Sequence, residues 1–397
     1  MAHFVTKISD IIEFNPRETI ARKQVCKKVP MEYLQPFTRQ ISGFEEAPYA
    51  GGTKFRNNDT IMARITPCLE NGKTAFVKGF AENEVVFGST EYIVMRAIPG
   101  ASDPVFIYYL ATSPSFREVA IKSMVGSSGR QRVQQDVLEN LELVLPDYET
   151  QVRVGKVLSA FDDKIELNTQ INHNLEEQAK AIFKSWFVDF EPFQNGKFID
   201  SELGQIPAGW QVADVYSIAS VIYGAPFASK RFLSEKIGHP IVRIRDLATE
   251  APQVYTDEIH PKGYIIKPGD IVVGMDGEFR AYLWGGEEAW LNQRVCVFKP
   301  KDEFASAFVR LSIMPLLAAV EASEVATTVI HLGKNDIDKF KIILPDTMTL
   351  EKYNAVAIPI YEQIVSNKLE ARRLAQLRDA LLPKLMSGAI DVSEIEV

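Results

Sequence analysis

An acidic and basic pattern in the middle of the chain has the residue types of a magnesium-dependent nuclease site. Pro146-Asp147 is followed by Asp162-Asp163-Lys164, and in such sites two carboxylates hold the metal while a lysine assists a water. Asp162 and Lys164, however, stand at i and i+2 of an expected helix, where side chains do not face one another. A related stretch later in the chain has Tyr361 and Gln363 at these positions. The pattern therefore predicts a solvated helix flank.

Other residues that could bind phosphate or metal also lack the spacing that such sites need. Gly72-Lys73-Thr74 has the ending of a phosphate-binding loop, but Pro67 stands where the first glycine is required. The histidines show no metal-ligand spacing and have no nucleophile beside them; they are His3, His173, His239, His260 and His331. The cysteines form no Cys-x-x-Cys pair and indicate a reducing compartment; they are Cys26, Cys68 and Cys296. We expect no catalytic site, metal or cofactor in this chain.

Local positive charge on turn-rich segments is the pattern that favours binding. The formal charge of −8 argues against indiscriminate association with nucleic acid, so any DNA contact must depend on local patches. Arginine is the commonest reader of guanine edges, and glutamine reads adenine. For each candidate taken singly, a solvated surface charge is the alternative. The candidate DNA contacts are Lys54, Arg56, Arg64, Lys73, Arg130, Gln131, Arg132, Lys230, Arg231, Arg243, Arg245, Arg280, Arg294 and Lys334.

These loops alternate with a long segment that occurs twice. Leu145-Pro146-Asp147 recurs as Leu344-Pro345-Asp346, a shift of 199 residues (346 minus 147). After each copy, apolar residues follow in steps of four and three, which is the seam of a coiled coil, and Asp147 is the expected N-cap of the first helix. The predicted seam contains Leu158, Phe161, Ile165, Asn168, Leu175 and Ile182 in the first copy, and Ile360, Ile364, Asn367, Leu374 and Leu381 in the second.

The two seam asparagines predict how the helices pair. An asparagine inside an apolar seam typically fixes register and partner at some cost in stability. We therefore expect Asn168 and Asn367 to mark the centre of an intramolecular antiparallel coiled coil. The second copy departs from the first at Pro359, which should kink the helix or delay its start, and at Arg378, which must reach solvent or pair. Gly388 is expected to end it.

The globular regions between the helices also resemble each other. Residues 215–220, 269–273 and 294–299 resemble residues 8–13, 58–62 and 91–96, with shifts of 207, 211 and 203. Short apolar runs with turn residues between them favour an α+β fold with two globular domains in pseudo-repeat, separated by the two helices. The expected division is 1–147, first globular domain; 148–187, central helix; 188–209, linker; 210–346, second globular domain; 347–388, C-terminal helix; and 389–397, tail.

The N-terminus and the most apolar run of the sequence do not predict membrane insertion. The N-terminus lacks a basic-then-apolar signal pattern. The most apolar run, 308–320, is short and is interrupted by Arg310 and Pro315. We expect a cytoplasmic protein.

Taken together, this alternation resembles the specificity subunit of type I restriction-modification systems. The resemblance rests on residues 143–147 with 161–168, on Leu203-Gly-Gln-Ile-Pro-Ala-Gly-Trp210, and on Leu381-Leu-Pro-Lys-Leu-Met-Ser-Gly388. It implies two target recognition domains that each read half of a split DNA site, and helices that dock two methyltransferase subunits. It also implies that any chemistry belongs to the partners, which would use S-adenosylmethionine, ATP and Mg, including possible restriction subunits.

The seam length agrees with a spacer between two half-sites. Its 33 residues, 154–186, span roughly 50 Å at about 1.5 Å per residue, which is the order of 15 base pairs. Two other classes stay open: a stand-alone DNA nuclease, which magnesium-dependent cleavage by the isolated chain would support, and a coiled-coil scaffold, which salt-insensitive binding to protein would support.

Overall fold

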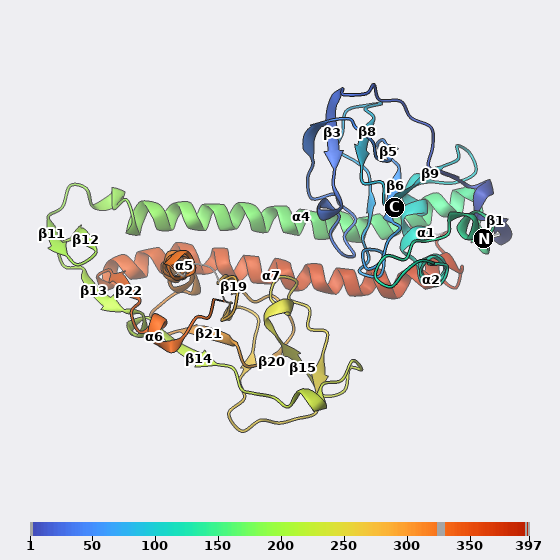
Figure 1. The fold of residues 1–397 in the computed structure, drawn as a ribbon. Helices are drawn as coiled ribbons and strands as arrows, with labels where there is room; N and C mark the ends of the chain where they lie inside the picture. Colours follow the sequence, from blue (N-terminus) through green and yellow to red (C-terminus); the bar gives the residue numbers. More distant parts are fainter. Residues whose placement is uncertain (1–2, 324–329, 394, 396–397) are drawn as a thin grey trace. The chain divides into compact units, whose positions relative to one another are not determined.

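The computed structural model describes residues 3–323, 330–393 and 395 of the chain. The chain divides into two compact units. Unit 1 contains residues 1–164 and 374–397, and unit 2 contains residues 165–373. Each unit therefore combines one β-rich domain with parts of two long helices (Figure 1).

The two long helices repeat each other in length and position. α4, Tyr148–Phe187, and α7, Thr347–Met386, are each 40 residues long, and their starts differ by 199 (347 minus 148). Asp147 Oδ1 accepts the Thr150 amide at 2.9 Å, and Asp346 Oδ1 accepts the Thr349 amide at 2.9 Å. The predicted cap at Asp147 is therefore confirmed, and its repeat Asp346 caps α7 in the same way, because each satisfies an amide of the first turn.

The described residues of unit 1 form two four-stranded sheets, a two-stranded ladder and three short α-helices. The first sheet has the order β2-β9-β6-β7, and the second has β4-β3-β8-β5 with a parallel β3-β8 pair. The strands are β1 His3–Lys7, β2 Ile12–Phe14, β3 Val25–Val29, β4 Glu45–Pro48, β5 Lys54–Phe55, β6 Thr60–Ala63, β7 Thr74–Phe76, β8 Val86–Gly88, β9 Tyr92–Ala97 and β10 Glu142–Pro146. The helices are α1 Pro104–Thr112, α2 Pro114–Lys122 and α3 Gln135–Glu139.

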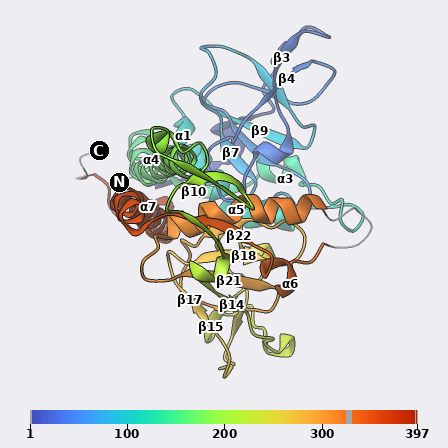
Figure 2. The same cartoon turned by 90° about the vertical axis from the view of Figure 1, so that its left-hand side faces the viewer.

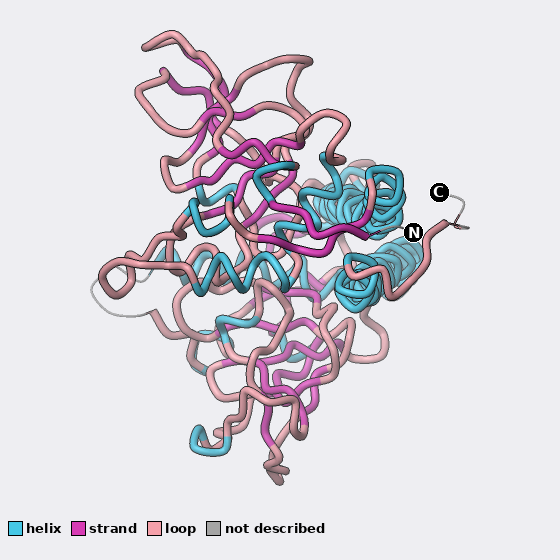
Figure 3. The backbone as a smooth tube through the Cα atoms, turned by 90° about the vertical axis from the view of Figure 1, so that its right-hand side faces the viewer, coloured by secondary structure: helices cyan, strands magenta, loops and turns pink. Residues whose placement is uncertain are grey.

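Unit 2 has the same strand orders. Its sheets are β14-β21-β18-β19 and β16-β15-β20-β17, again with one parallel pair, β15-β20, and the ladder β13-β22 corresponds to β1-β10. The strands are β11 Phe198–Ser201, β12 Gly204–Pro207, β13 Gln211–Asp214, β14 Ala219–Tyr223, β15 His239–Val242, β16 Tyr255–Thr256, β17 Ile265–Ile266, β18 Ile271–Gly274, β19 Ala281–Leu283, β20 Ala289–Leu291, β21 Val295–Pro300 and β22 Lys341–Leu344. The helices are α5 Ser306–Ser323 and α6 Lys334–Ile337. The resemblance between the globular regions thus reflects a repeated topology, with long loops between the strands (Figure 3).

The long helices contribute to the core of each unit. In unit 1, Val154 and Leu158 of α4 join Leu382 and Leu385 of α7 in one apolar cluster with the domain. In unit 2, aromatic side chains of α4, among them Phe187, pack with Tyr353 of α7. Each domain therefore buries its apolar face against both helices.

α5 is a core helix of unit 2. Among the described residues it is the one helix long and apolar enough to cross a membrane by length and composition. Its side chains Phe308, Ile313 and Leu317 are fully buried. The helix, labelled in Figure 2, contacts β19 and β21. These three side chains belong to the apolar core of unit 2.

Two expectations about the connecting segments differ from the structure. The late start expected from Pro359 is wrong, since α7 begins at Thr347 and runs through an exposed Pro359. The segment 188–209, expected as a linker, forms the β11-β12 hairpin. The ring centroids of Phe193, in this segment, and Trp210 lie 4.9 Å apart. Trp210 Nε1 donates to Asp346 Oδ2 at 3.0 Å. The segment thus packs as part of unit 2.

Candidate nucleic-acid interface and domain anchors

In unit 1, the predicted DNA contacts that are most exposed to solvent lie on the loop before α3. Val125 and Ile65 both form β-bridges with Arg132, which hold the base of this loop. Arg132 pairs with Glu91 at 2.7 Å, and this hydrogen-bonded pair holds the pKa of Glu91 below its usual value. Arg130 is exposed and has no acidic partner among the described residues, with Gln131 beside it. Arg130 therefore presents an uncompensated charge to solvent.

The other predicted contacts of unit 1 are engaged within their own domain. Lys54 Nζ donates to the Glu18 carbonyl at 2.7 Å, and Lys73 Nζ donates to the Met31 carbonyl at 3.0 Å. Arg56 lies 3.5 Å from a Glu18 carboxylate oxygen. Arg64 donates to the Val133 carbonyl at 3.4 Å. These four residues, Lys54, Lys73, Arg56 and Arg64, thus have local partners that a DNA contact would have to share or replace.

Most predicted contacts of unit 2 are paired with acids. Lys230 and Arg245 are exposed and have no acidic partner among the described residues. The remaining five form ion pairs: Arg231 with Asp257 at 2.8 Å, Arg243 with Asp246 at 3.0 Å, Arg280 with Glu321 at 3.3 Å, Arg294 with Asp276 at 3.3 Å and Lys334 with Asp338 at 2.9 Å. Sequence reading found the cations but not these acids, because most of them lie far away along the chain.

The second domain has a histidine at the place of Arg132. His331 forms a β-bridge with Asp276, as Arg132 does with Ile65, and 331 minus 132 is again 199. His331 Nδ1 lies 2.7 Å from Asp276 Oδ1 and 3.0 Å from Arg294 Nη1. No group of three or more His, Cys, Asp or Glu side chains that could hold a metal occurs among the described residues.

The seam asparagines contact each other in unit 2. Asn168 Nδ2 lies 3.4 Å from the Asn367 carbonyl, and Asn367 Nδ2 donates to Asn172 Oδ1 at 2.8 Å. Asn172 Nδ2 donates to the Ile364 carbonyl at 3.1 Å, so the partner number falls as the α4 number rises. The helices are therefore antiparallel, as predicted. Of the predicted seam, Leu158, Asn168, Ile364 and Asn367 are buried, and Phe161, Ile165, Leu175, Ile182, Ile360, Leu374 and Leu381 are half-buried.

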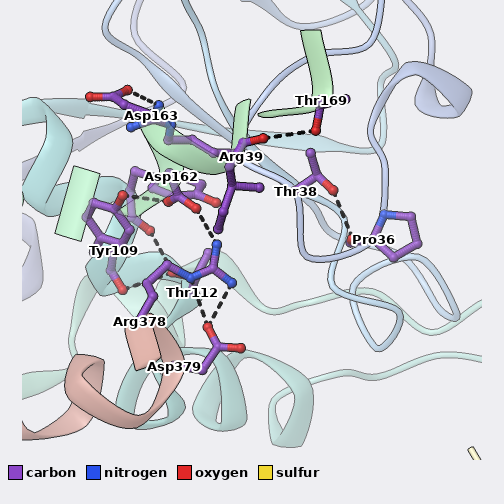
Figure 4. Close-up of polar contacts among 12 residues, drawn as sticks. Pro36, Thr38, Arg39, Tyr109, Thr112, Asp162, Asp163, Thr169, Arg378 and Asp379 are labelled. Atoms are coloured by element: carbon purple, nitrogen blue, oxygen red, sulfur yellow. Dashed lines mark hydrogen bonds and ion pairs between the residues drawn. The ribbon is translucent and has the colours of Figure 1, made fainter. Parts of the chain in front are cut away.

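The prediction of a solvated flank at Asp162 is wrong. Asp162 is 3% exposed, and both of its carboxylate oxygens have donors. Tyr109 Oη donates to Oδ2 at 2.6 Å, and Arg378 of α7 donates to Oδ1 (Figure 4). Burial lowers the pKa of Arg378, but the charges of Asp162 and Asp379 raise it above its ordinary value. Arg378 thus pairs, which was one of its two expected outcomes. Its partner is Asp162, which the sequence pattern had placed in solvent.

Asp163, the neighbour of Asp162, holds a second part of the first domain. Arg39 is 5% exposed and pairs with Asp163, while the Arg39 carbonyl accepts the Phe76 amide of β7 at 2.9 Å. Burial, followed by the Asp162 charge, raises the pKa of Tyr109, so its hydroxyl remains a proton donor. None of these contacts had a signal in the local sequence pattern.

The geometry defines a class of proteins in which two related β-rich domains each dock on a pair of repeated antiparallel helices. The family described as type I restriction modification DNA specificity domain matches residues 4–177 and again residues 207–378. The chain therefore belongs to this family: it is the DNA specificity subunit of a type I restriction-modification system and is itself non-catalytic.

Curated relatives agree with this membership, and a solved structure shares the fold. The chain is 30% identical to the MjaIX specificity subunit of Methanocaldococcus jannaschii, over 73% of this chain and 70% of the relative. It is 26% identical to the HindI specificity subunit of Haemophilus influenzae, over 88% and 90%. The crystal structure of a type I S subunit from M. genitalium has a TM-score of 0.53 at 15% identity, over 97% and 96%, which shows the fold.

Proposed function

We propose that each β-rich domain reads one half of a bipartite DNA site and that the paired helices set the distance between the halves. The observation that carries this proposal is the double repeat. There is one family match and one set of sheets for each β-rich domain, and α4 and α7 each contribute residues to both units. A chain with two related reading domains suits a site with two parts. The domain division given above, 1–147 and 210–346, is part of this proposal.

Readout would use exposed loops, and chemistry would be supplied by partners. Arg130 and Gln131 in the first domain, and Lys230 and Arg245 in the second, are the favoured contacts, because no acid competes for the three cations among the described residues. Two methyltransferase subunits would dock on the helices and methylate adenine with S-adenosylmethionine, in the cytoplasm. Restriction subunits using ATP and Mg would act on unmethylated DNA.

The structure argues against the nuclease alternative. A metal site at Asp162 needs free carboxylate oxygens, but Tyr109 and Arg378 take both of them. The guanidinium charge would also repel a cation. A scaffold that binds protein alone remains distinguishable by experiment.

Mapping of methylated adenines in the host tests the proposal. A strain with the chain and its partner subunits should carry one bipartite motif, and deletion of the chain should remove that motif alone. Arg130→Gln and Arg245→Gln should then weaken discrimination in different halves of the motif. Arg132→Gln is the matched control for Arg130, because Glu91 already compensates Arg132. A host whose methylation pattern is the same with and without the chain would contradict the proposal and favour the scaffold.

A further inference from the structure

Each β-rich domain is attached to its long helix at the same two repeat positions. In unit 1, Gly155 of α4 faces the start of α1: a Cβ at Gly155 would lie 3.0 Å from Asp103 Oδ1 and 3.3 Å from the Phe106 amide nitrogen. Seven residues further along α4, Asp162 accepts the hydroxyl of Tyr109, which is in α1. The anchor positions of unit 1, Gly155 and Asp162, are thus one heptad apart and lie on one face of α4.

The anchor positions of unit 2 are Asn354 and Tyr361, which are 155 and 162 shifted by 199. Asn354 Oδ1 accepts the amide of Ala305, just before α5, at 3.3 Å. Arg310 of α5 donates to the Tyr361 hydroxyl at 3.2 Å. The two domains therefore place the start and the second turn of a helix, α1 or α5, on equivalent residues of α4 and α7.

The chemistry at the equivalent positions is different. In unit 1 a tyrosine of the domain donates to a carboxylate of the long helix, and Arg378 balances the charge. In unit 2 an arginine of the domain donates to a tyrosine of the long helix, and Glu176 of α4 lies 3.7 Å from that arginine. The place of attachment is the same although the residues differ, so the attachment itself, and not one particular residue pair, is the common feature.

These contacts fix direction as well as position. Apolar packing is non-directional, so a domain held by it alone can rock on its helix. A hydrogen bond to a buried charged group is short and directional, so each tyrosine hydroxyl holds its partner at one angle. Asp162 and Arg310 are both buried, and a buried polar group that loses a hydrogen bond costs free energy. In unit 1, the Arg39 to Asp163 pair adds a second direction from the loop between β3 and β4.

We propose that the Tyr109 to Asp162 and Arg310 to Tyr361 contacts are positioning contacts that set the orientation of each target domain on the helices, and hence the accuracy with which its own half-site is read. This inference rests on the proposed function. Neither contact touches DNA: each acts through the angle at which its domain presents its loops.

Two matched substitutions test the proposal, because each removes a single hydroxyl and leaves the ring in place. Tyr109→Phe removes the donor to Asp162, and Tyr361→Phe removes the acceptor of Arg310. Each variant replaces the wild-type chain in the host with its partner subunits, and methylated adenines are mapped at matched sites and at sites with one wrong base pair. A wrong base pair typically reduces binding by about fivefold or more.

The expected result is that each variant loses much of this discrimination in one half of the motif only, and that the two variants affect opposite halves. Total methylation at matched sites should fall by less than about twofold. Discrimination that drops equally in both halves, or that is unchanged in both variants, would overturn the positioning role. Thermal unfolding of the two purified variants shows whether a drop in discrimination in both halves accompanies a loss of stability. A wild-type strain without any bipartite motif would instead contradict the proposed function.

Discussion

Removal of Arg378 should destabilise unit 1 by leaving the carboxylate of Asp162 buried with one donor. The side chains of Arg378 and Asp162 are 12% and 4% exposed, so the pair is shielded from water and salt. Breaking such a buried pair costs about 3–5 kcal/mol, whereas an exposed pair contributes about 0–1 kcal/mol. For Arg378→Met we therefore expect a loss of about 3 kcal/mol or more in the free energy of unfolding.

The double variant separates the charge from the packing. Asp162→Asn keeps an acceptor for Tyr109 and removes the buried charge, so Asp162→Asn with Arg378→Met should recover at least about 1 kcal/mol relative to Arg378→Met alone. Arg132→Gln, which breaks the exposed pair with Glu91, is the control and should cost less than about 1 kcal/mol.

Hydrogen exchange measured on peptides of α1 and on tryptophan-containing peptides reports the two units separately. The 4 tryptophans, Trp186, Trp210, Trp284 and Trp290, all belong to unit 2. Exchange in α1 should therefore accelerate in Arg378→Met while urea unfolding followed by tryptophan fluorescence changes little. The reasoning that the pair is a compensated buried charge would be refuted by either of two results. One is a loss below about 1 kcal/mol in the free energy of unfolding reported by exchange in α1, and the other is no recovery of that free energy in the double variant.

Three further predictions concern a helix cap, the helix pair and the DNA contacts. Burial alone would raise the pKa of Asp346, but hydrogen bonds from Thr349 and Trp210 hold it below its usual range; this stability is present above the unfolded pKa of about 4 and is lost as pH falls through the lowered value. Asp346→Ala should thus cost about 1 kcal/mol in urea unfolding at pH 7 and less below pH 4. Asn367→Leu should broaden the distribution of species in light scattering, and unchanged monodispersity, stability and partner stoichiometry would remove its role in fixing the pair. Arg130→Gln should lower the salt slope of DNA binding by the assembled complex by about 0.9, with Arg132→Gln nearly unchanged.

Sequence periodicity predicted the parts of the fold that depend on neighbouring residues. The aspartate caps follow from capping preferences, which act within one turn. The antiparallel asparagine contacts join distant residues, but the matching heptad seams of the two copies identified both partners. The delayed start expected from Pro359 did not occur because a proline costs a long helix one hydrogen bond, and the buried Tyr353 and Ile364 on either side keep α7 packed.

The anchors were missed because they depend on pairs that are distant in sequence. Asp162 and Arg378 are 216 residues apart, and Tyr109 is 53 residues from Asp162. Local pattern placed Asp162 on a polar flank, and only the docked domain makes that flank an interior. The segment 188–209 was read from its turn residues, although Phe193 and Trp210 already supplied the aromatic surface that packs it on unit 2.

The most direct test of the central claim is the spacer length read by a chain with longer helices. Seven residues would be inserted after Asn168 in α4 and seven at the opposed position before Asn367 in α7, so that the heptad seam and the antiparallel contacts are kept. The insertion adds about 10 Å, or about three base pairs. Methylation mapping should then show the same two half-sites with a spacer longer by about three base pairs. The same half-sites with an unaltered spacer would contradict the account.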